Sequence, residues 1–170
     1  MEFLVDSYRV SGKNQIKRKT FNILIVDDDL DVADNLKKLL ELRGHNITIV
    51  DDGPRCITHC KDKEKQYNMV FIDYHMEGLD GAQVAEIVKC GSKSPLIFAY
   101  TGDNSLKAIN DFRQVGMDGA IIKPIDIQSI QMLMGKLEQN LVLDRSMIKS
   151  LSRKSSRSIL IFEDSLIVSV

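Results

Sequence analysis

The sequence predicts an α/β fold in which helices cover both faces of a single parallel β-sheet. Short apolar runs alternate along the chain with longer stretches whose apolar residues recur at helical spacing. This alternation favours right-handed crossover connections, which place successive strands parallel in one sheet. The five expected strands are Phe21–Val26, Asn46–Val50, Met69–Ile72, Pro95–Tyr100 and Gly119–Ile122.

Five helices are expected, one after each strand. Gly44, Gly91 and Gly116 follow three of the apolar stripes, which is typical of helix C-terminal caps. The second helix is more polar and is expected to continue to about Gln66. The other four stripes run from Leu30 to Leu40, from Leu79 to Val88, from Leu106 to Val115 and from Ile127 to Leu141.

Composition places the chain among soluble globular proteins and excludes several classes of function. Of its 170 residues, 44% are hydrophobic and 28% are charged, and the net charge is -1. This charge gives no reason to expect nucleic-acid binding or membrane contact, and no apolar run approaches the roughly 20 residues of a membrane span. The three cysteines are an odd number without a CxxC pair, so we expect a cytoplasmic, reducing setting.

Four segments are expected from these patterns. Residues 1–20 have little periodicity, end in a short basic cluster and are expected to be an arm or a linker. The α/β domain covers residues 21–141, and a basic, Ser-rich linker covers residues 142–158. Residues 159–170 begin a further apolar run. Cys56, His59 and Cys60 share one helix face, but three soft ligands alone make a metal site there a poor prediction.

Polar residues follow four of the five expected strands. The central apolar strand ends at Asp73, and the first strand runs directly into Asp27, Asp28 and Asp29. Thr101 and Lys123 follow the fourth and fifth strands. An aspartate at a strand end often only caps a helix or forms a turn, but that accounts for one aspartate and not for the whole set. Because the carboxyl ends of parallel strands meet at one edge, we expect a single site there.

This set of side chains suits phosphoryl chemistry with magnesium. Clustered carboxylates are the hard oxygen ligands that Mg²⁺ prefers, and Mg²⁺ leaves room for phosphate. Lys123 supplies a positive charge and Thr101 a hydroxyl, while Asp73 is positioned to be a nucleophile that becomes an aspartyl phosphate. The sequence has no P-loop, no GxSxG elbow and no HExxH pair.

The motifs ILIVDDD, VFIDYHMEGLDG, FAYTGD and GAIIKP resemble, in order and spacing, the receiver domain of two-component response regulators. The resemblance implies a flavodoxin-like fold with strand order 2-1-3-4-5. It implies that Asp73 accepts phosphate from a histidine kinase or a histidine phosphotransfer protein. It further implies that Asp28, Asp73 and the His75 main-chain carbonyl bind Mg²⁺ directly and that Asp27 binds it through water. In such domains the lysine, here Lys123, holds a phosphoryl oxygen and is followed by a cis proline, and the hydroxyl residue, here Thr101, is the switch.

Two departures from the family pattern leave alternatives open. Glu77 stands where the family usually has proline, and Ala120 stands where it usually has an aromatic residue. One alternative is therefore a receiver-like interaction module that is not phosphorylated. A more remote alternative is a phosphatase of the haloacid-dehalogenase type, which needs a second aspartate where this chain has His75.

The C-terminal segment repeats the pattern of the first strand. Aligning Ile159 with Ile23 matches six residues identically and places Glu163 and Asp164 at the positions of Asp27 and Asp28. The segment therefore resembles the start of a second receiver, and a chance apolar strand ending in acids is the alternative. With five strands completing the first sheet, we expect this tail to be a loosely placed extension. It is expected to cover an apolar patch or to pair with an edge strand, including that of a neighbouring receiver or a second copy.

Overall fold

The computed structural model describes residues 19–91, 94–139 and 159–161. Its strands are β1 Asn22–Val26, β2 Asn46–Val50, β3 Met69–Ile72, β4 Leu96–Thr101, β5 Gly119–Ile122 and β6 Ile159–Ile161. Its helices are α1 Leu30–Glu41, α2 Gly53–Lys61, α3 Gly81–Lys89, α4 Leu106–Gln114 and α5 Ile127–Gln139. Within the described residues, no helix combines the length and apolarity that a membrane span requires.

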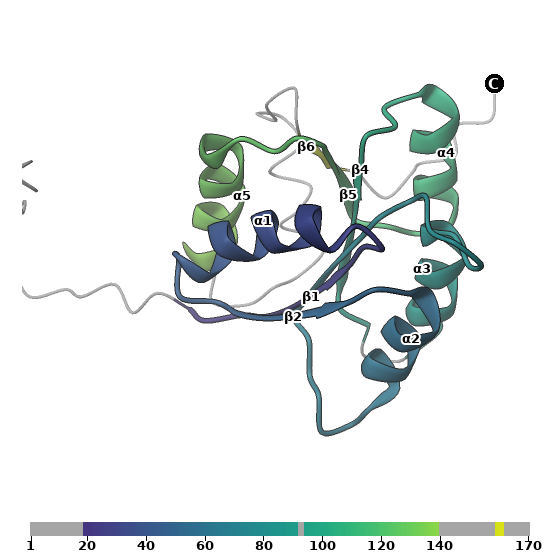
Figure 1. The fold of residues 1–170 in the computed structure, drawn as a ribbon, viewed down its shortest axis with the longest axis horizontal. Coiled ribbons are helices and arrows are strands. Elements are labelled where there is room, and N and C mark those ends of the chain that lie inside the picture. Colours follow the sequence, from purple (N-terminus) through teal and green to yellow (C-terminus); the bar gives the residue numbers. More distant parts are fainter. Residues whose placement is uncertain (1–18, 92–93, 140–158, 162–170) are drawn as a thin grey trace, which may run out of the picture.

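The sheet has the predicted topology over its first five strands. The strand order is β2-β1-β3-β4-β5-β6, and the pairs from β2 to β5 are all parallel. Helices α1 and α5 cover one face of the sheet, and α2, α3 and α4 cover the other (Figure 1). The predicted flavodoxin-like α/β fold is therefore confirmed.

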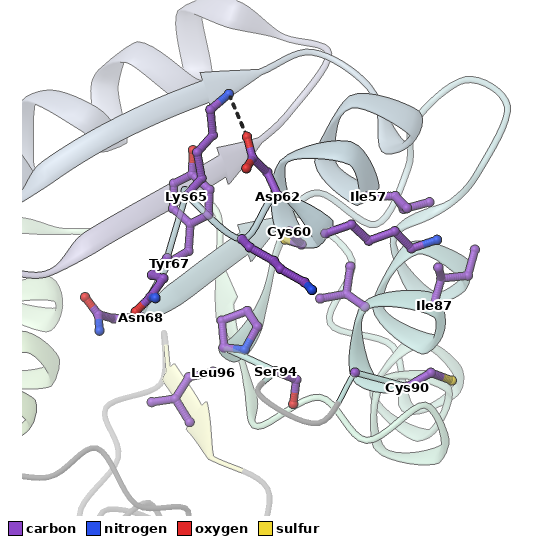
Figure 2. A pocket seen from close by; sticks show the side chains of 16 residues that line it. Ile57, Cys60, Asp62, Lys65, Tyr67, Asn68, Ile87, Cys90, Ser94 and Leu96 are labelled. Carbon is purple, nitrogen blue, oxygen red and sulfur yellow. Dashed lines mark ion pairs between the residues drawn. The ribbon is translucent and has the colours of Figure 1, made fainter.

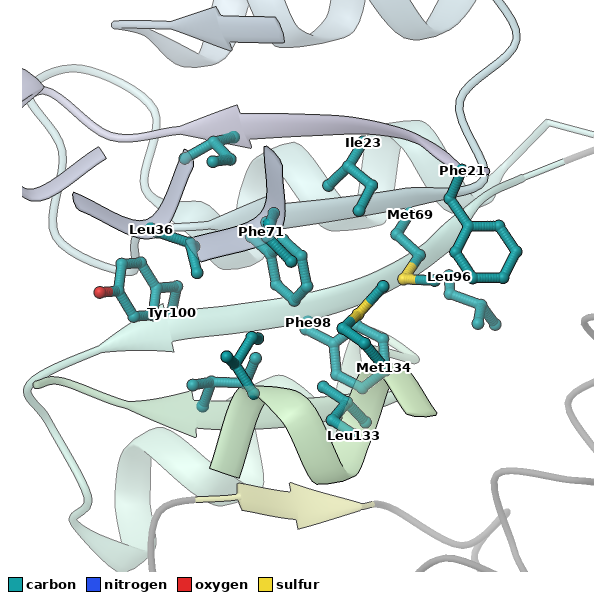
Figure 3. Close-up of a cluster of buried hydrophobic side chains, with 14 of the residues drawn as sticks. Phe21, Ile23, Leu36, Met69, Phe71, Leu96, Phe98, Tyr100, Leu133 and Met134 are labelled. Atoms are coloured by element: carbon teal, nitrogen blue, oxygen red, sulfur yellow. The ribbon is translucent and has the colours of Figure 1, made fainter. Parts of the chain in front are cut away.

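Two apolar layers hold the helices to the sheet. The larger layer lies under α1 and α5, where Phe71 and Phe98 of adjacent strands pack with their ring centroids 5.7 Å apart (Figure 3). The second layer lies under α2, α3 and α4 and includes Val70, Ile97 and Phe112. Because β1, β3 and β4 bury side chains on both faces, they form a rigid base for the residues that follow them.

The first residues of three helices are more exposed than the apolar pattern of the sequence predicts. Leu30, Leu106 and Ile127 are 56%, 79% and 49% exposed, so they do not belong to the buried stripes. Each is the first residue of its helix and directly follows the loop at the carboxyl edge of the sheet. The prediction that the second helix continues to about Gln66 is also wrong, because extended backbone at Asp62 ends α2 at Lys61.

The tail adds a strand that the sequence analysis did not place in this sheet. Ile159–Ile161 pairs antiparallel with β5, so the expectation of a sheet completed by five strands is wrong. The expected pairing with an edge strand is found, and the edge belongs to the same chain (Figure 1). Most of the expected N-terminal arm, the 142–158 linker and residues 162–170 lie outside the described residues, so the second receiver stays a prediction.

Candidate functional site

Three carboxylates meet at the carboxyl edge of the sheet. Carboxylate oxygens of Asp27, Asp28 and Asp73 all lie within 4.8 Å of one another. Asp27 follows β1 and Asp73 follows β3, and the Asp73 N–H donates to the Val26 carbonyl at 2.8 Å. Direct pairing of β1 with β3 therefore brings these two acids together. Asp27 and Asp73 are buried, whereas Asp28 is exposed.

Lys123 supplies the positive charge that such a group of carboxylates requires. Its Nζ lies 2.7 Å from Asp27 Oδ2 and 3.3 Å from Asp73 Oδ1, so one ammonium contacts both buried carboxylates. It also lies over the Tyr100 ring, 4.9 Å from the ring centre, which is a cation–π contact. Burial, together with Asp27 and Asp73, raises the pKa of Tyr100 to about 12, so this hydroxyl stays neutral. The Lys123–Pro124 peptide bond is cis, as the resemblance implies.

Thr101 is the last residue of β4 and is fully buried. Its Oγ1 accepts a hydrogen bond from the Asp103 N–H at 3.1 Å, and its carbonyl accepts one from the Lys123 N–H at 2.8 Å. The threonine is therefore tied both to the loop that follows β4 and to the backbone of the residue that carries the site lysine. This places a hydroxyl on the same edge of the sheet as the carboxylates.

The three consecutive aspartates have different surroundings. The Asp29 side chain accepts hydrogen bonds from the Asp31 and Val32 N–H groups and is the N-cap of α1. The Asp27 side chain faces Lys123 and also accepts a hydrogen bond from the Asp29 N–H at 3.0 Å. Asp28 lies between them with its carboxylate in the cluster and open to solvent. One aspartate therefore caps a helix, and two remain for a cation.

These donors fit a magnesium ion. A cluster of carboxylate oxygens with one exposed member offers hard ligands and keeps one side open for water and phosphate. His75 is placed on the loop after β3, and its Nε2 lies 3.7 Å from Asp103 Oδ2. The part expected of its main-chain carbonyl stays a prediction. Among the described residues, Cys56, His59 and Cys60 form no such group, and His59 Nδ1 lies 2.9 Å from the Tyr67 hydroxyl oxygen.

Burial is the main cause of a raised pKa at Asp73. Lys123 opposes this effect, and the negative charge of Asp27 adds to it. The ionised carboxylate is thus less favourable in the folded protein than in the unfolded chain. A cation such as a metal ion, placed next to Asp73, would therefore stabilise its ionised, nucleophilic form.

This shift predicts that Asp73→Asn stabilises the metal-free protein at neutral pH. The wild type carries the cost of the ionised carboxylate at every pH above the raised folded pKa, and the cost disappears below the ordinary value of 3.8, where both states are protonated. The gain should therefore shrink as the pH falls toward 3.8. Thermal unfolding of both proteins in a chelator, across this pH range, measures it, and a less stable variant at neutral pH contradicts the prediction.

Tyr74, directly after Asp73, is a residue that the sequence analysis did not single out. Its hydroxyl donates to Asp111 Oδ2 at 2.9 Å, and its ring packs edge-on against Phe112 at 5.0 Å. The hydrogen bond to Asp111 is the main cause that raises the pKa of Tyr74 to about 12. The residue next to the central carboxylate is therefore joined to the middle of α4. The only sequence signal was an aromatic residue at an exposed strand end, which is too common to select it.

We expect Tyr74→Phe to destabilise the fold by about 1 kcal/mol, the typical net value of one hydrogen bond, because it removes the hydroxyl but keeps the ring. Asp111→Ala, which removes the acceptor oxygen, is the partner variant in a double-mutant cycle measured by urea unfolding. The two changes should be less than additive, because both remove the same bond. Strict additivity would show that the hydroxyl and Asp111 do not act on each other.

A cavity lies at the other end of the sheet. It encloses about 1260 Å³ between the end of α2, the following loop, the end of α3 and the start of β4. Figure 2 shows its side chains, with Lys65 pointing toward Asp62 at the rim, where their charged atoms lie 3.9 Å apart. It holds none of the clustered carboxylates and no residue of the predicted site. The chemistry of this chain is therefore expected at the carboxyl edge and not in this cavity.

Comparison with known proteins identifies the family. The sequence profile of the response regulator receiver domain matches residues 23–134. The chain belongs to this family and is a receiver domain of two-component signalling.

Curated relatives are long proteins that contain a similar segment. The CAI-1 autoinducer sensor kinase/phosphatase CqsS of Vibrio cholerae is 29% identical over 66% of this chain. The transcription factor SKN7 of Saccharomyces cerevisiae is 31% identical over 66% of this chain. The aligned segments make up only 16% of CqsS and 18% of SKN7.

Solved structures support the fold. The receiver domain of the sensor histidine kinase PA1611 of Pseudomonas aeruginosa, solved with a magnesium ion in its active-site cleft, aligns with a TM-score of 0.63 and 19% identity. It covers 72% of this chain and 100% of that one. The receiver domain of Saccharomyces cerevisiae Ssk1, solved with the histidine phosphotransfer protein Ypd1, aligns with a TM-score of 0.65 and 18% identity, covering 76% of this chain and 98% of that one.

Proposed function

We propose that this receiver domain accepts a phosphoryl group on Asp73 from a phosphohistidine. The observation that carries the proposal is the position of the buried Asp73 carboxylate, which lies 3.3 Å from Lys123 Nζ and clusters with the Asp27 and Asp28 carboxylates. Asp29 caps a helix, Asp27 holds the closer contact with Lys123, and Asp28 is exposed, which leaves Asp73 as the acid best placed to react. The residues that act on phosphate are Asp73, Thr101 and Lys123.

In the proposed reaction, a carboxylate oxygen of Asp73 attacks phosphorus and forms the acyl phosphate bond. The phosphorus–nitrogen bond of the donor breaks, and the imidazole nitrogen keeps the electron pair. Lys123 moves only a short way from its contacts at 2.7 and 3.3 Å to hold a phosphoryl oxygen, and Thr101 presents its hydroxyl to another. Asp27, Asp28 and Asp73, with the His75 main-chain carbonyl, would hold Mg²⁺, whose charge offsets that of the phosphoryl group.

The partners follow from this chemistry. A histidine kinase or a histidine phosphotransfer protein is the donor class, consistent with the phosphotransfer complex of one structural neighbour and the sensor kinases among the relatives. We infer that the domain acts inside a larger protein, since it spans less than a fifth of the first curated relatives. It catalyses only its own phosphorylation and dephosphorylation, and its free cysteines suit a cytoplasmic setting.

Intact-mass measurement after treatment with acetyl phosphate and Mg²⁺ tests this function. The wild type should gain one phosphoryl group and Asp73→Asn none, because the amide is not a nucleophile. Asp34→Asn is the matched control, since it makes the same chemical change on the surface of α1, where Asp34 pairs with Lys38, and it should be labelled like the wild type. Labelling of Asp73→Asn would assign the phosphate to another residue. A wild type that takes no phosphate from this donor or from a kinase would favour the unphosphorylated interaction module.

A further inference from the structure

The outer edge of β5 has the properties of a strand-binding surface. On its inner side β5 pairs with β4, so without the tail its outward N–H and C=O groups would form the open edge of the sheet. Natural edge strands are protected by charges, proline or bulges. The strand Gly119–Ile122 has none of these within it, and Gly119, Ala120 and Ile121 are buried. Without a covering segment, this edge would be prone to pair with a strand from another molecule.

A strand is seated on this edge in the structure. Ile121 pairs with Ile159, Ala120 with Leu160 and Gly119 with Ile161, in antiparallel register. The seated segment is a short apolar stretch of two isoleucines and a leucine, which suits strand pairing. The surface is thus matched to an extended apolar peptide that runs opposite to β5.

The length of the intervening chain allows the seated strand to come from the same molecule. Strand β6 starts opposite Ile121, near the carboxyl edge, so the chain must return along roughly 20 Å, the length of the 13-residue helix α5. Residues 140–158 lie between the two elements. A chain of that length reaches at most roughly 65 Å when fully extended, so it is long enough for this span. Pairing within one molecule is then favoured by a high effective concentration.

We propose that the outer edge of β5 is a strand-binding surface and that Ile159–Ile161 of the same chain occupies it as a displaceable cover. Release of the tail exposes the edge to an extended apolar strand from another protein chain, which binds by adding to the sheet. The tail thereby controls access to a surface that ends two residues before Lys123. This inference does not depend on phosphorylation of Asp73.

The test uses the full chain and a fluorescent peptide of residues 158–164 as the probe. Leu160→Pro removes a backbone donor and disfavours pairing in the middle of the tail strand, and Ser155→Pro is the control before the strand. The variant should bind the peptide about tenfold or more tightly than the wild type, whose edge is already occupied. Its β5 amides should also exchange faster, whereas Ser155→Pro should match the wild type in both measurements.

A second variant, Ile159→Asp with Ile161→Asp, should behave like Leu160→Pro because charge opposes edge pairing without altering the backbone. Thermal unfolding of each variant checks that the domain remains folded. Equal peptide affinity in all proteins, or no binding to either variant, would overturn the proposal. A wild-type dimer that Leu160→Pro converts to a monomer would also overturn it, because the strand would then come from a second copy.

Discussion

Replacing Asp28 with alanine is expected to abolish magnesium-dependent phosphorylation while the fold is kept. Asp28 is the exposed member of the carboxylate cluster, so its removal takes away a ligand without opening the core. The loss of labelling should be at least the roughly 10–100-fold that follows when the outer partners of a metal ion are removed. The free energy of unfolding of the metal-free protein should change by no more than about 0.5 kcal/mol, as for other surface substitutions.

Its neighbour Asp29 offers a control with the opposite result. Asp29→Ala removes the N-cap of α1 and should cost about 1 kcal/mol of stability. It should leave labelling by acetyl phosphate unchanged, because Asp29 lies outside the cluster. Urea unfolding in a chelator and intact-mass labelling with added Mg²⁺ measure the two effects separately. If both variants lose labelling equally, the division of roles between these adjacent acids is wrong.

The parts of the fold that the sequence predicted are those with strong local signals. Strands β1, β3 and β4 are continuous apolar runs because both of their faces are buried, and such runs contrast sharply with the loops around them. The residues that follow them meet because parallel pairing aligns strand ends, as the bond from the Asp73 N–H to the Val26 carbonyl shows. Side chains at strand ends could therefore be assigned to one edge before any distance was known.

The features that the sequence did not predict depend on tertiary context. Leu30 and Leu106 fit a helical stripe, yet each is the first residue of its helix and is exposed in the assembled fold. The bond between the Tyr74 hydroxyl and Asp111 joins residues 37 positions apart, which periodicity cannot detect. The apolar sequence of residues 159–161 predicts a strand. Its pairing with the edge of β5 depends on how the sheet is assembled. The sequence pattern thus predicts which residues suit a strand or a helix. The contacts between distant residues depend on the assembled fold.

Gly81, the first residue of α3, is expected to tolerate a side chain poorly because it packs against the backbone of Asp73. A Cβ at residue 81 would lie 2.3 Å from the Asp73 carbonyl oxygen, and this is a backbone atom that cannot rotate away. The close approach belongs to a turn in which the Gly81 N–H donates to the Tyr74 carbonyl at 3.0 Å. Gly81→Ala should therefore force the strand end and α3 apart and cost about 3 kcal/mol, the upper part of the usual range for overpacking.

Gly102→Ala is the matched control, because a Cβ at residue 102 meets no atom within 4 Å. Gly81 is the first residue of α3 and Gly102 lies in the loop after β4, both at the carboxyl edge of the sheet, so both variants change the same residue type near the same site. Thermal and urea unfolding should show a large loss for Gly81→Ala and a change within about 0.5 kcal/mol for Gly102→Ala. Labelling of Asp73 should fall in Gly81→Ala even under conditions where it remains folded, since relief of the clash must displace the backbone that carries the carboxylate. Equal stability of the two variants would mean that the loop moves freely, and the placement of Asp73 would then depend on Lys123 and the sheet alone.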